Sequence, residues 1–269
     1  METQTLELLI CTLNEGIRRV PKMLLPPVGN VRYIVSWQLT GTIRLDLPEE
    51  LSSREDVTVY QLEGRGLAAN RNNALRNATA DILLLADDDA CYTPQSLQRV
   101  LYNFRKYPKA DFICFRAKDH EGNPLKEYAN EPWTYAKRPK NTYVSSIEIA
   151  FRRSANLPFF DERFGLGSKY LAMGEEEVFL QMAFERDMKI IYVPETIVET
   201  NGDTTGKRFL TLAAARRSKG AVLCFLYGPT SAAARSLKYV ASLDVPAYRK
   251  WNYYKDMLAG IRYIIHDKL

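Results

Sequence analysis

The chain has 269 residues, of which 46% are hydrophobic and 26% are charged. This length and composition allow a large buried core and exclude an intrinsically disordered chain. The four cysteines show neither the paired spacing of a zinc site nor the density of a disulfide framework, which favours a reduced, intracellular protein. The sequence contains no apolar run of membrane-spanning length and no secretory signal pattern, so we expect a cytoplasmic protein, at most peripheral to the membrane's inner face.

The formal net charge of +5 is unevenly distributed along the chain. Residues 1–202 carry 25 basic and 28 acidic side chains, whereas residues 203–269 carry 12 basic and 4 acidic ones. A basic segment of this kind favours an anionic membrane or an anionic substrate as partner. We expect no nucleic acid partner, because no recognisable nucleic-acid-reading motif accompanies the charge.

Strand-like and helix-like segments alternate along the acidic part of the chain. Apolar or β-branched runs predict strands at 6–12, 31–38, 56–62, 81–87, 110–117 and 189–195, and a strand with a turn within 145–155. Apolar residues at helical spacing predict helices at 67–78, 94–107 and 175–187. This alternation predicts an α/β fold with a mostly parallel sheet flanked by helices. We expect a catalytic domain over residues 1–205 and a basic, mostly helical extension over 206–269; the polar segment 118–142 should be irregular.

Polar residues follow three of the predicted strands at the point where each strand ends. They are Asn14 with Glu15, Ser36 with Trp37, and the acidic run from Asp87 to Asp89. In open α/β sheets, ligands bind at the carboxyl ends of the strands. The sequence therefore predicts that these segments meet at one rim.

The acidic run Asp87 to Asp89 has two interpretations. It can be a solvated strand end or a cap for the following helix, since Asp is common before helices. It can also be a divalent metal site, because carboxylate oxygens suit Mg²⁺ or Mn²⁺ and such ions often bind through one or two carboxylates plus phosphate oxygens. In the second case a diphosphate completes the site.

Two further groups carry alternative interpretations. Three glutamates, Glu175 to Glu177, are either a charged helix start stabilised by the helix dipole or the source of a general base. The glycine-punctuated, apolar segment before them favours a loop that approaches a ligand. Arg71, near the start of the helix at 67–78, either addresses phosphate oxygens or pairs with a surface acid.

The order of these motifs resembles that of the family-2 glycosyltransferases of the GT-A fold, bacterial enzymes that move a sugar from a nucleotide diphosphate to an acceptor hydroxyl. The resemblance covers roughly residues 6–202. It lies in five segments taken in order: CTLNEG, GRGLAANRNNALRNATADILLLADDDACYTP, IEIAFRRS, FDERFGLGSKYLAMGEEEVFL and KIIYVPE.

The resemblance implies roles on the donor side of the site. Asp88 matches the residue that faces the donor ribose, Asp89 matches the ligand of Mn²⁺ or Mg²⁺, and Asp87 belongs to the same motif. Arg71 matches the basic residue near the diphosphate. The positions that match the nucleotide-facing segments are Thr12, Asn14, Glu15 and Ser36, the last beside Trp37.

The resemblance also implies the chemistry. Glu176 matches the catalytic base, with Glu175 beside it, and the reaction inverts the anomeric centre. The implied donor is a nucleotide-diphosphate sugar, most simply a UDP-sugar, and the implied acceptor is a saccharide or lipid-linked, in bacterial surface polysaccharide or glycolipid synthesis. A Gln-x-x-Arg-Trp element is absent after Glu176, which favours single transfer over polymerisation.

Relatives often carry a metal-binding histidine after the last strand, where this chain has Thr200 and Asn201. We expect neither His120, in the polar segment, nor His266 to replace it. A non-catalytic sugar-nucleotide-binding scaffold therefore stays an alternative, as does a sugar nucleotidyltransferase, although CTLNEGIRRV lacks that class's glycine-rich loop.

The basic extension also has two interpretations. Its helices either pack on the catalytic domain or present a face to an anionic membrane surface. In the second case we expect Trp251, Tyr253 and Tyr254 at the interface. The basic residues expected to face the headgroups are Arg216, Arg217, Lys219 and Lys250.

Overall fold

The computed structural model describes residues 4–140, 142–201 and 208–266. Within this part the chain forms two compact units. The first comprises the described residues of Met1–Arg65, Ala69–Phe159 and Met182–Gly202, and the second comprises those of Gly66–Ala68, Phe160–Gln181 and Asp203–Leu269. The division expected from the sequence, at residue 205, stays a prediction.

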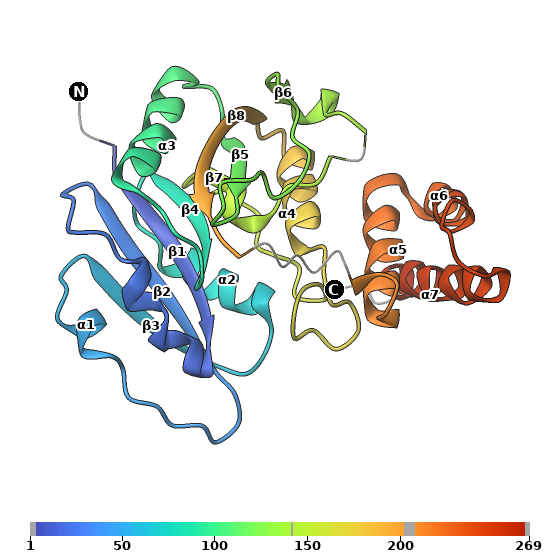
Figure 1. The fold of residues 1–269 in the computed structure, drawn as a ribbon, viewed down its shortest axis with the longest axis horizontal. Helices are drawn as coiled ribbons and strands as arrows, with labels where there is room; N and C mark the ends of the chain where they lie inside the picture. The colour runs from blue at the N-terminus through green and yellow to red at the C-terminus, as the bar shows by residue number, and fades with distance from the viewer. Residues whose placement is uncertain (1–3, 141, 202–207, 267–269) are drawn as a thin grey trace. The chain divides into compact units, whose positions relative to one another are not determined.

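The first unit is built on one sheet, which over the described residues has eight strands in the order β3-β2-β1-β4-β7-β5-β8-β6. Figure 1 shows β3, β2, β1 and β4 side by side, in blue to cyan. The pairs β1–β2, β1–β4, β2–β3 and β5–β8 are parallel, whereas β7 runs antiparallel to both of its neighbours and β6 to β8. The strands are β1 (Leu6–Leu13), β2 (Val31–Leu39), β3 (Val57–Glu63), β4 (Ile82–Asp87), β5 (Phe112–Lys118), β6 (Trp133–Thr134), β7 (Ile149–Arg152) and β8 (Ile190–Glu199).

The apolar runs of the sequence form the centre of this sheet. Seven of the eight residues of β1 and five of the six of β4 are buried, as expected for strands covered on both faces. Helix α3 (Pro94–Lys106) buries Leu97, Val100 and Phe104, and it begins at a capping box formed by Thr93 and Ser96. Each buried side chain of this size contributes about 1.5–3 kcal/mol to folding, so the core fixes the strand ends in place.

The other α-helices of the described residues are α1 (Glu49–Ser52), α2 (Leu67–Asn77), α4 (Glu175–Glu185), α5 (Ala213–Tyr227), α6 (Pro229–Ala241) and α7 (Ala247–His266). The mostly parallel α/β sheet and the helical character of the C-terminal segment agree with the sequence prediction. The structure differs from the prediction at two places. Strand β8 continues to Glu199, four residues beyond its predicted end, and the short helix α1 was not predicted.

The described part of the polar segment 118–142, which leaves out residue 141, contains more regular structure than its composition suggests. Strand β6 pairs with β8, and a 3-10 turn follows at Tyr135–Lys137. The buried carboxylate of Glu148 accepts hydrogen bonds at 2.6 Å from Lys126 Nζ and from Tyr128 OH. These bonds tie the segment to the sheet, and burial raises the pKa of Glu148 despite them.

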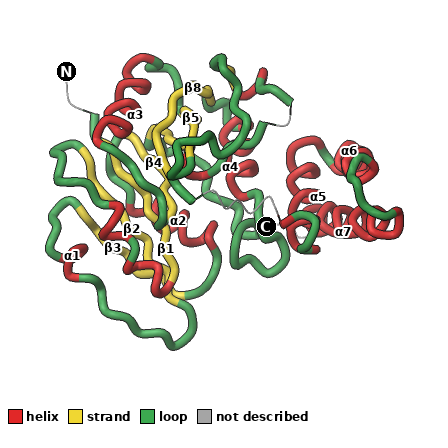
Figure 2. Tube along the Cα trace, viewed as in Figure 1, coloured by secondary structure: helices red, strands yellow, loops and turns green. Residues whose placement is uncertain are grey.

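The second unit contains α5, α6 and α7, drawn red in Figure 2. Helices α5 and α7 cross at two glycines: a Cβ on Gly220 would lie 2.0 Å from the carbonyl oxygen of Met257, and one on Gly260 would lie 1.9 Å from that of Arg217. Only glycine permits backbones to approach this closely. None of the described helices is long and apolar enough to cross a membrane.

Candidate functional site

The candidate site begins where three parallel strands of the first unit end. In the register of the sheet, Thr12 of β1 lies opposite Trp37 of β2, and Cys11 lies opposite Asp87 of β4. The carboxyl ends of parallel strands lie at the same edge of a sheet. The predicted meeting of these segments at one rim is therefore confirmed.

Helix α2 forms hydrogen bonds with two residues of this rim. The side chain of Asn70 donates to the carbonyl oxygen of Thr12 at 3.0 Å, and that of Asn73 donates to Ser36 Oγ at 2.8 Å. Ser36 is fully buried, so its hydroxyl is engaged inside the protein. Sequence reasoning missed both asparagines, because an asparagine inside a helix gives no signal of the loop that it contacts.

Arg71 of α2 is buried and lies beside the acidic run. Its Nη2 is 3.3 Å from Asp87 Oδ1, and Asp87 also accepts from Ser146 Oγ at 3.5 Å. A buried guanidinium is a fixed positive charge that forms bidentate bonds with phosphate oxygens as readily as with carboxylates. The alternative of an exposed surface pair does not fit, because the arginine is buried.

Asp88 is held by the loop that follows β1. Its Oδ2 accepts from Thr12 Oγ1 at 2.5 Å, and its Oδ1 accepts from Arg19 Nη2 at 2.7 Å and from Arg19 Nε at 3.2 Å. The Arg19 side chain is 61% exposed, so it can leave Asp88 without crossing the core. Arg19 was not predicted; its position in CTLNEGIRRV, just after the first strand, was the available signal.

Asp89 lies one residue further along the rim. Partial burial, followed by the negative charges of Asp87 and Asp88, raises the pKa of its carboxyl group. A nearby cation favours the charged form of such a carboxylate. Carboxylate oxygens are ligands that suit Mg²⁺ or Mn²⁺. Among the described residues, no group of three or more His, Cys, Asp or Glu side chains forms a ready ligand set. An ion on Asp89 would take further oxygen ligands from phosphate and water.

The other predicted nucleotide-facing residues divide into two kinds. Asn14 shapes the loop: it has a positive φ of 48°, its side chain bonds with Thr40, and its carbonyl oxygen accepts from Trp37 Nε1 at 2.9 Å. Glu15 instead forms an exposed ion pair with Arg18 at 2.9 Å. Their roles toward a nucleotide stay predictions.

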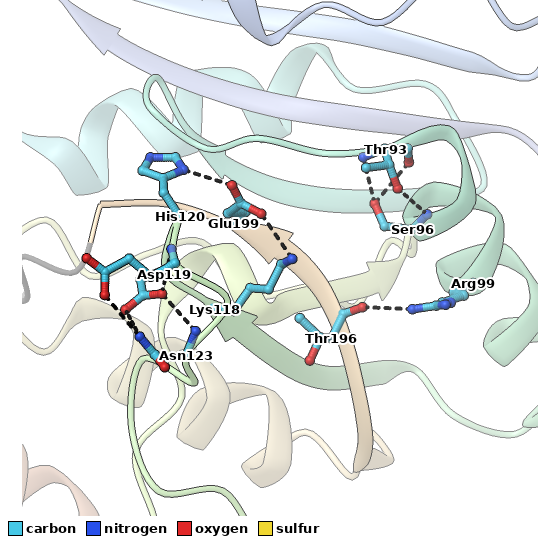
Figure 3. A network of polar contacts seen from close by, with 10 residues as sticks. Thr93, Ser96, Arg99, Lys118, Asp119, His120, Asn123, Thr196 and Glu199 are labelled. Atoms are coloured by element: carbon cyan, nitrogen blue, oxygen red, sulfur yellow. Dashed lines mark hydrogen bonds and ion pairs between the residues drawn. The ribbon is translucent and has the colours of Figure 1, made fainter.

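His120 lies at the ends of β5 and β8, as Figure 3 shows. Its Nδ1 is 2.9 Å from Glu199 Oε1, and Lys118 Nζ is 3.1 Å from Glu199 Oε2. Hydrogen bonds from His120 and Lys118 lower the pKa of Glu199. The backbone of Glu199 pairs with that of Cys91, two residues after Asp89. His120 thus bonds to a residue whose backbone pairs with Cys91; that His120 does not replace the metal-binding histidine stays a prediction.

The three glutamates belong to the second unit, at the first turn of α4. Glu175, Glu176 and Glu177 are all buried, which rules out a solvated, charged helix start. The preceding loop bends at Gly165 and Gly174, whose φ angles of +97° favour glycine. The Glu175 carboxyl group packs so closely on Gly165 that a Cβ there would lie 3.0 Å from it. The helix N-terminus favours negative charge on all three.

The architecture is an α/β fold with a mostly parallel sheet and a polar rim at its carboxyl edge. The family model for Glycosyl transferase family 2 matches residues 43–172. A glycosyltransferase from Haemophilus influenzae, described as uncharacterized, is 36% identical over 93 residues, which are 34% of this chain and 29% of that protein. The match thus spans under a third of the relative. The family match and the match to this relative confirm the resemblance carried by the motifs.

Solved structures share the fold. The crystal structure of Staphylococcus aureus TarS residues 1–349 matches with a TM-score of 0.61 and 15% identity, over 98% of this chain and 72% of that one. The same TarS segment in complex with UDP-GlcNAc matches with a TM-score of 0.59 and 15% identity, over 98% of this chain and 76% of that one. The fold is therefore that of the GT-A glycosyltransferases.

Proposed function

We propose that this chain is an inverting glycosyltransferase that moves one sugar at a time from a nucleotide diphosphate to an acceptor hydroxyl. The donor is a UDP-sugar, in keeping with the complex of TarS with UDP-GlcNAc. The acceptor is a saccharide or a lipid-linked molecule. The reaction belongs to bacterial surface polysaccharide or glycolipid synthesis at the cytoplasmic face of the membrane. The observation that carries the proposal is the rim, where Asp88 is positioned by Thr12 and Arg19 beside Asp89.

In this proposal the rim binds the donor. Asp88 accepts hydrogen bonds from the ribose hydroxyls, in place of those that it receives from the exposed Arg19. The buried charge of Arg71 stabilises the diphosphate as it leaves. Asp89 would hold Mn²⁺ or Mg²⁺, which when bound supplies positive charge to the diphosphate oxygens.

On the acceptor side, Glu176 takes the proton of the attacking hydroxyl. A carboxylate at the first turn of a helix is favoured in its charged form, which is the form that accepts a proton. The acceptor then attacks from the face opposite the departing diphosphate, so the anomeric centre inverts without a covalent intermediate on the enzyme.

A comparison of three variants tests the proposal. UDP release from UDP-sugars gives turnover, and calorimetry with UDP gives donor-site affinity. Glu176→Gln should lower turnover by about 10²- to 10⁴-fold and leave UDP affinity unchanged, as expected for loss of a general base. Asp89→Asn should remove the Mn²⁺ dependence of UDP binding. Glu177→Gln is the matched control in the same helical turn and should keep most turnover.

Two results would contradict the proposal in different ways. Near-normal turnover of the Glu176→Gln variant would reject Glu176 as the base. UDP binding by the wild-type protein without UDP release from any UDP-sugar would favour the non-catalytic scaffold.

A further inference from the structure

Helix α7 carries a stripe of exposed aromatic and basic side chains: Tyr248, Trp251, Lys255 and Arg262. They follow one another at intervals of three, four and seven residues, so they share one face of the helix. Tyr248 is 65% exposed and Trp251 is 56% exposed, and Lys255 and Arg262 are also exposed. We call these four residues the α7 stripe.

The opposite face of α7 is the one that packs inside the second unit. Its buried residues are Tyr253, Met257, Gly260 and Ile261. The prediction of which residues face a membrane was therefore partly wrong. Tyr253 is buried, and so is Arg216, which bonds to Asp256 Oδ2 at 2.7 Å. Arg217 likewise bonds to the carbonyl oxygen of Tyr170.

The charge of the C-terminal helical segment complements an anionic surface. Residues 208–266, all described, contain ten Lys or Arg and two Asp. The one acidic residue of α7 within this range, Asp256, lies off the stripe and pairs with Arg216. Lys255 Nζ lies 5.4 Å from the centre of the Trp251 ring, so the cation and the apolar ring occupy the same patch. The stripe thus contains no acidic residue that would repel an anionic surface.

We propose that the α7 stripe binds the surface of an anionic lipid bilayer. The tryptophan and tyrosine rings enter the headgroup boundary, where amphipathic aromatic side chains are favoured, and Lys255 and Arg262 contact the lipid phosphates. Electrostatic attraction of this kind is worth about fivefold in affinity per basic residue. The contact is peripheral and deepens the proposed function, because it would hold the enzyme where a lipid-linked acceptor is presented. The binding step itself does not depend on catalysis.

Flotation of the full-length protein with vesicles tests this inference. We expect the protein to float with vesicles of mixed phosphatidylcholine and phosphatidylglycerol, to remain behind with phosphatidylcholine alone, and to lose binding as salt is raised. The double variant Lys255→Ala/Arg262→Ala should weaken binding by roughly 25-fold, the product of two fivefold losses. Trp251→Ala should also weaken it. In the wild type, tryptophan emission should shift to shorter wavelength on binding, because Trp37 and Trp133 are already buried.

The first unit offers a matched control. Tyr102 on α3 is 53% exposed and lies in a shallow groove with Arg99 and Arg105, so Tyr102→Ala/Arg105→Ala removes the same chemistry elsewhere. This variant should float like the wild type. The inference is overturned if the protein does not float with phosphatidylglycerol, if the stripe variants float unchanged while thermal unfolding shows them folded, or if the control loses as much binding. UDP release measured without vesicles separates this outcome from failure of the proposed function.

Discussion

A methyl group added at Gly16 should weaken donor binding without unfolding the protein. Gly16 lies in the 3-10 turn Asn14–Arg18, directly after β1. A Cβ at this position would lie 2.4 Å from Asp88 Oδ2, 2.4 Å from Thr12 Oγ1 and 3.1 Å from Arg19 Nη2. The first two separations are shorter than real contacts of a Cβ allow. In the Gly16→Ala variant the carboxylate of Asp88 must therefore move away from its two partners.

The size of the effect follows from the bonds that position Asp88. Hydrogen bonds to charged groups contribute about 1.5–3 kcal/mol each. If the shift of Asp88 costs the equivalent of one such bond in the complex, UDP should bind about 10- to 100-fold more weakly. The fold should be little affected, because the crowded atoms belong to side chains that can rotate. Replacing Gly by Ala also lowers the entropy of the unfolded chain, which stabilises by about 0.4–1 kcal/mol.

Calorimetry with UDP and Mn²⁺ measures the affinity, and thermal unfolding measures the stability. Gly29→Ala is the matched control, because a Cβ there meets no atom within 4 Å and its φ is not in the positive range. We expect wild-type affinity for the control and weaker binding for Gly16→Ala, with both variants folded. Wild-type UDP affinity in a folded Gly16→Ala protein would refute the idea that Asp88 must occupy its observed position to bind the donor.

Two further predictions concern stability. Gly220→Ala should lower the free energy of unfolding by about 1–3 kcal/mol in a urea titration, since its Cβ would meet the backbone oxygen of Met257 at 2.0 Å and backbone cannot rotate away; an unchanged midpoint would contradict the close helix crossing. The hydrogen bond from Arg54 lowers the pKa of Asp56 below its ordinary value of 3.8. Asp56 therefore contributes stability above about pH 4 that is lost as the pH falls through its lowered pKa. The Asp56→Asn variant should lose less stability in acid than the wild type, and identical acid profiles would count against the pair.

The rim was predictable because its position follows from strand ends. Each apolar run ends at a polar residue, and parallel strands bring those ends together. The contacts within the rim were not predictable. Arg19 reaches Asp88 only because the turn after β1 aims it there, and one residue earlier Arg18 forms an exposed pair with Glu15. Two neighbouring arginines thus have different partners because the backbone directs their side chains differently.

His120 illustrates a second limit. The sequence places it in a polar segment, and polarity alone suggests a position away from the sheet. In the structure it lies two residues after the end of β5, and β8 runs long enough to bring Glu199 beside it. The contact between His120 and Glu199 thus depends on where β8 ends, and the apolar run of the sequence predicts that end four residues too early.

The glutamates of α4 are buried, although three acidic residues at a helix start usually indicate an exposed position. Three acidic residues at a helix start usually predict a solvated surface, and the helix dipole is sufficient reason for them. Here Gly165 and Gly174 adopt positive φ angles, all three glutamates are buried, and the carboxyl group of Glu175 packs on Gly165. The sequence contained this information in the spacing of the glycines, but burial depends on where the loop travels.

The acidic residues of the rim have different surroundings. Asp87 lies beside Arg71, Asp88 accepts two hydrogen bonds from Arg19, and Glu199 lies between Lys118 and His120. These acids are balanced by cations of the chain itself. At Asp89 burial and the two neighbouring carboxylates prevail, and they raise its pKa. An added positive charge would favour the charged form of Asp89, which is the residue that the family resemblance assigns to the metal.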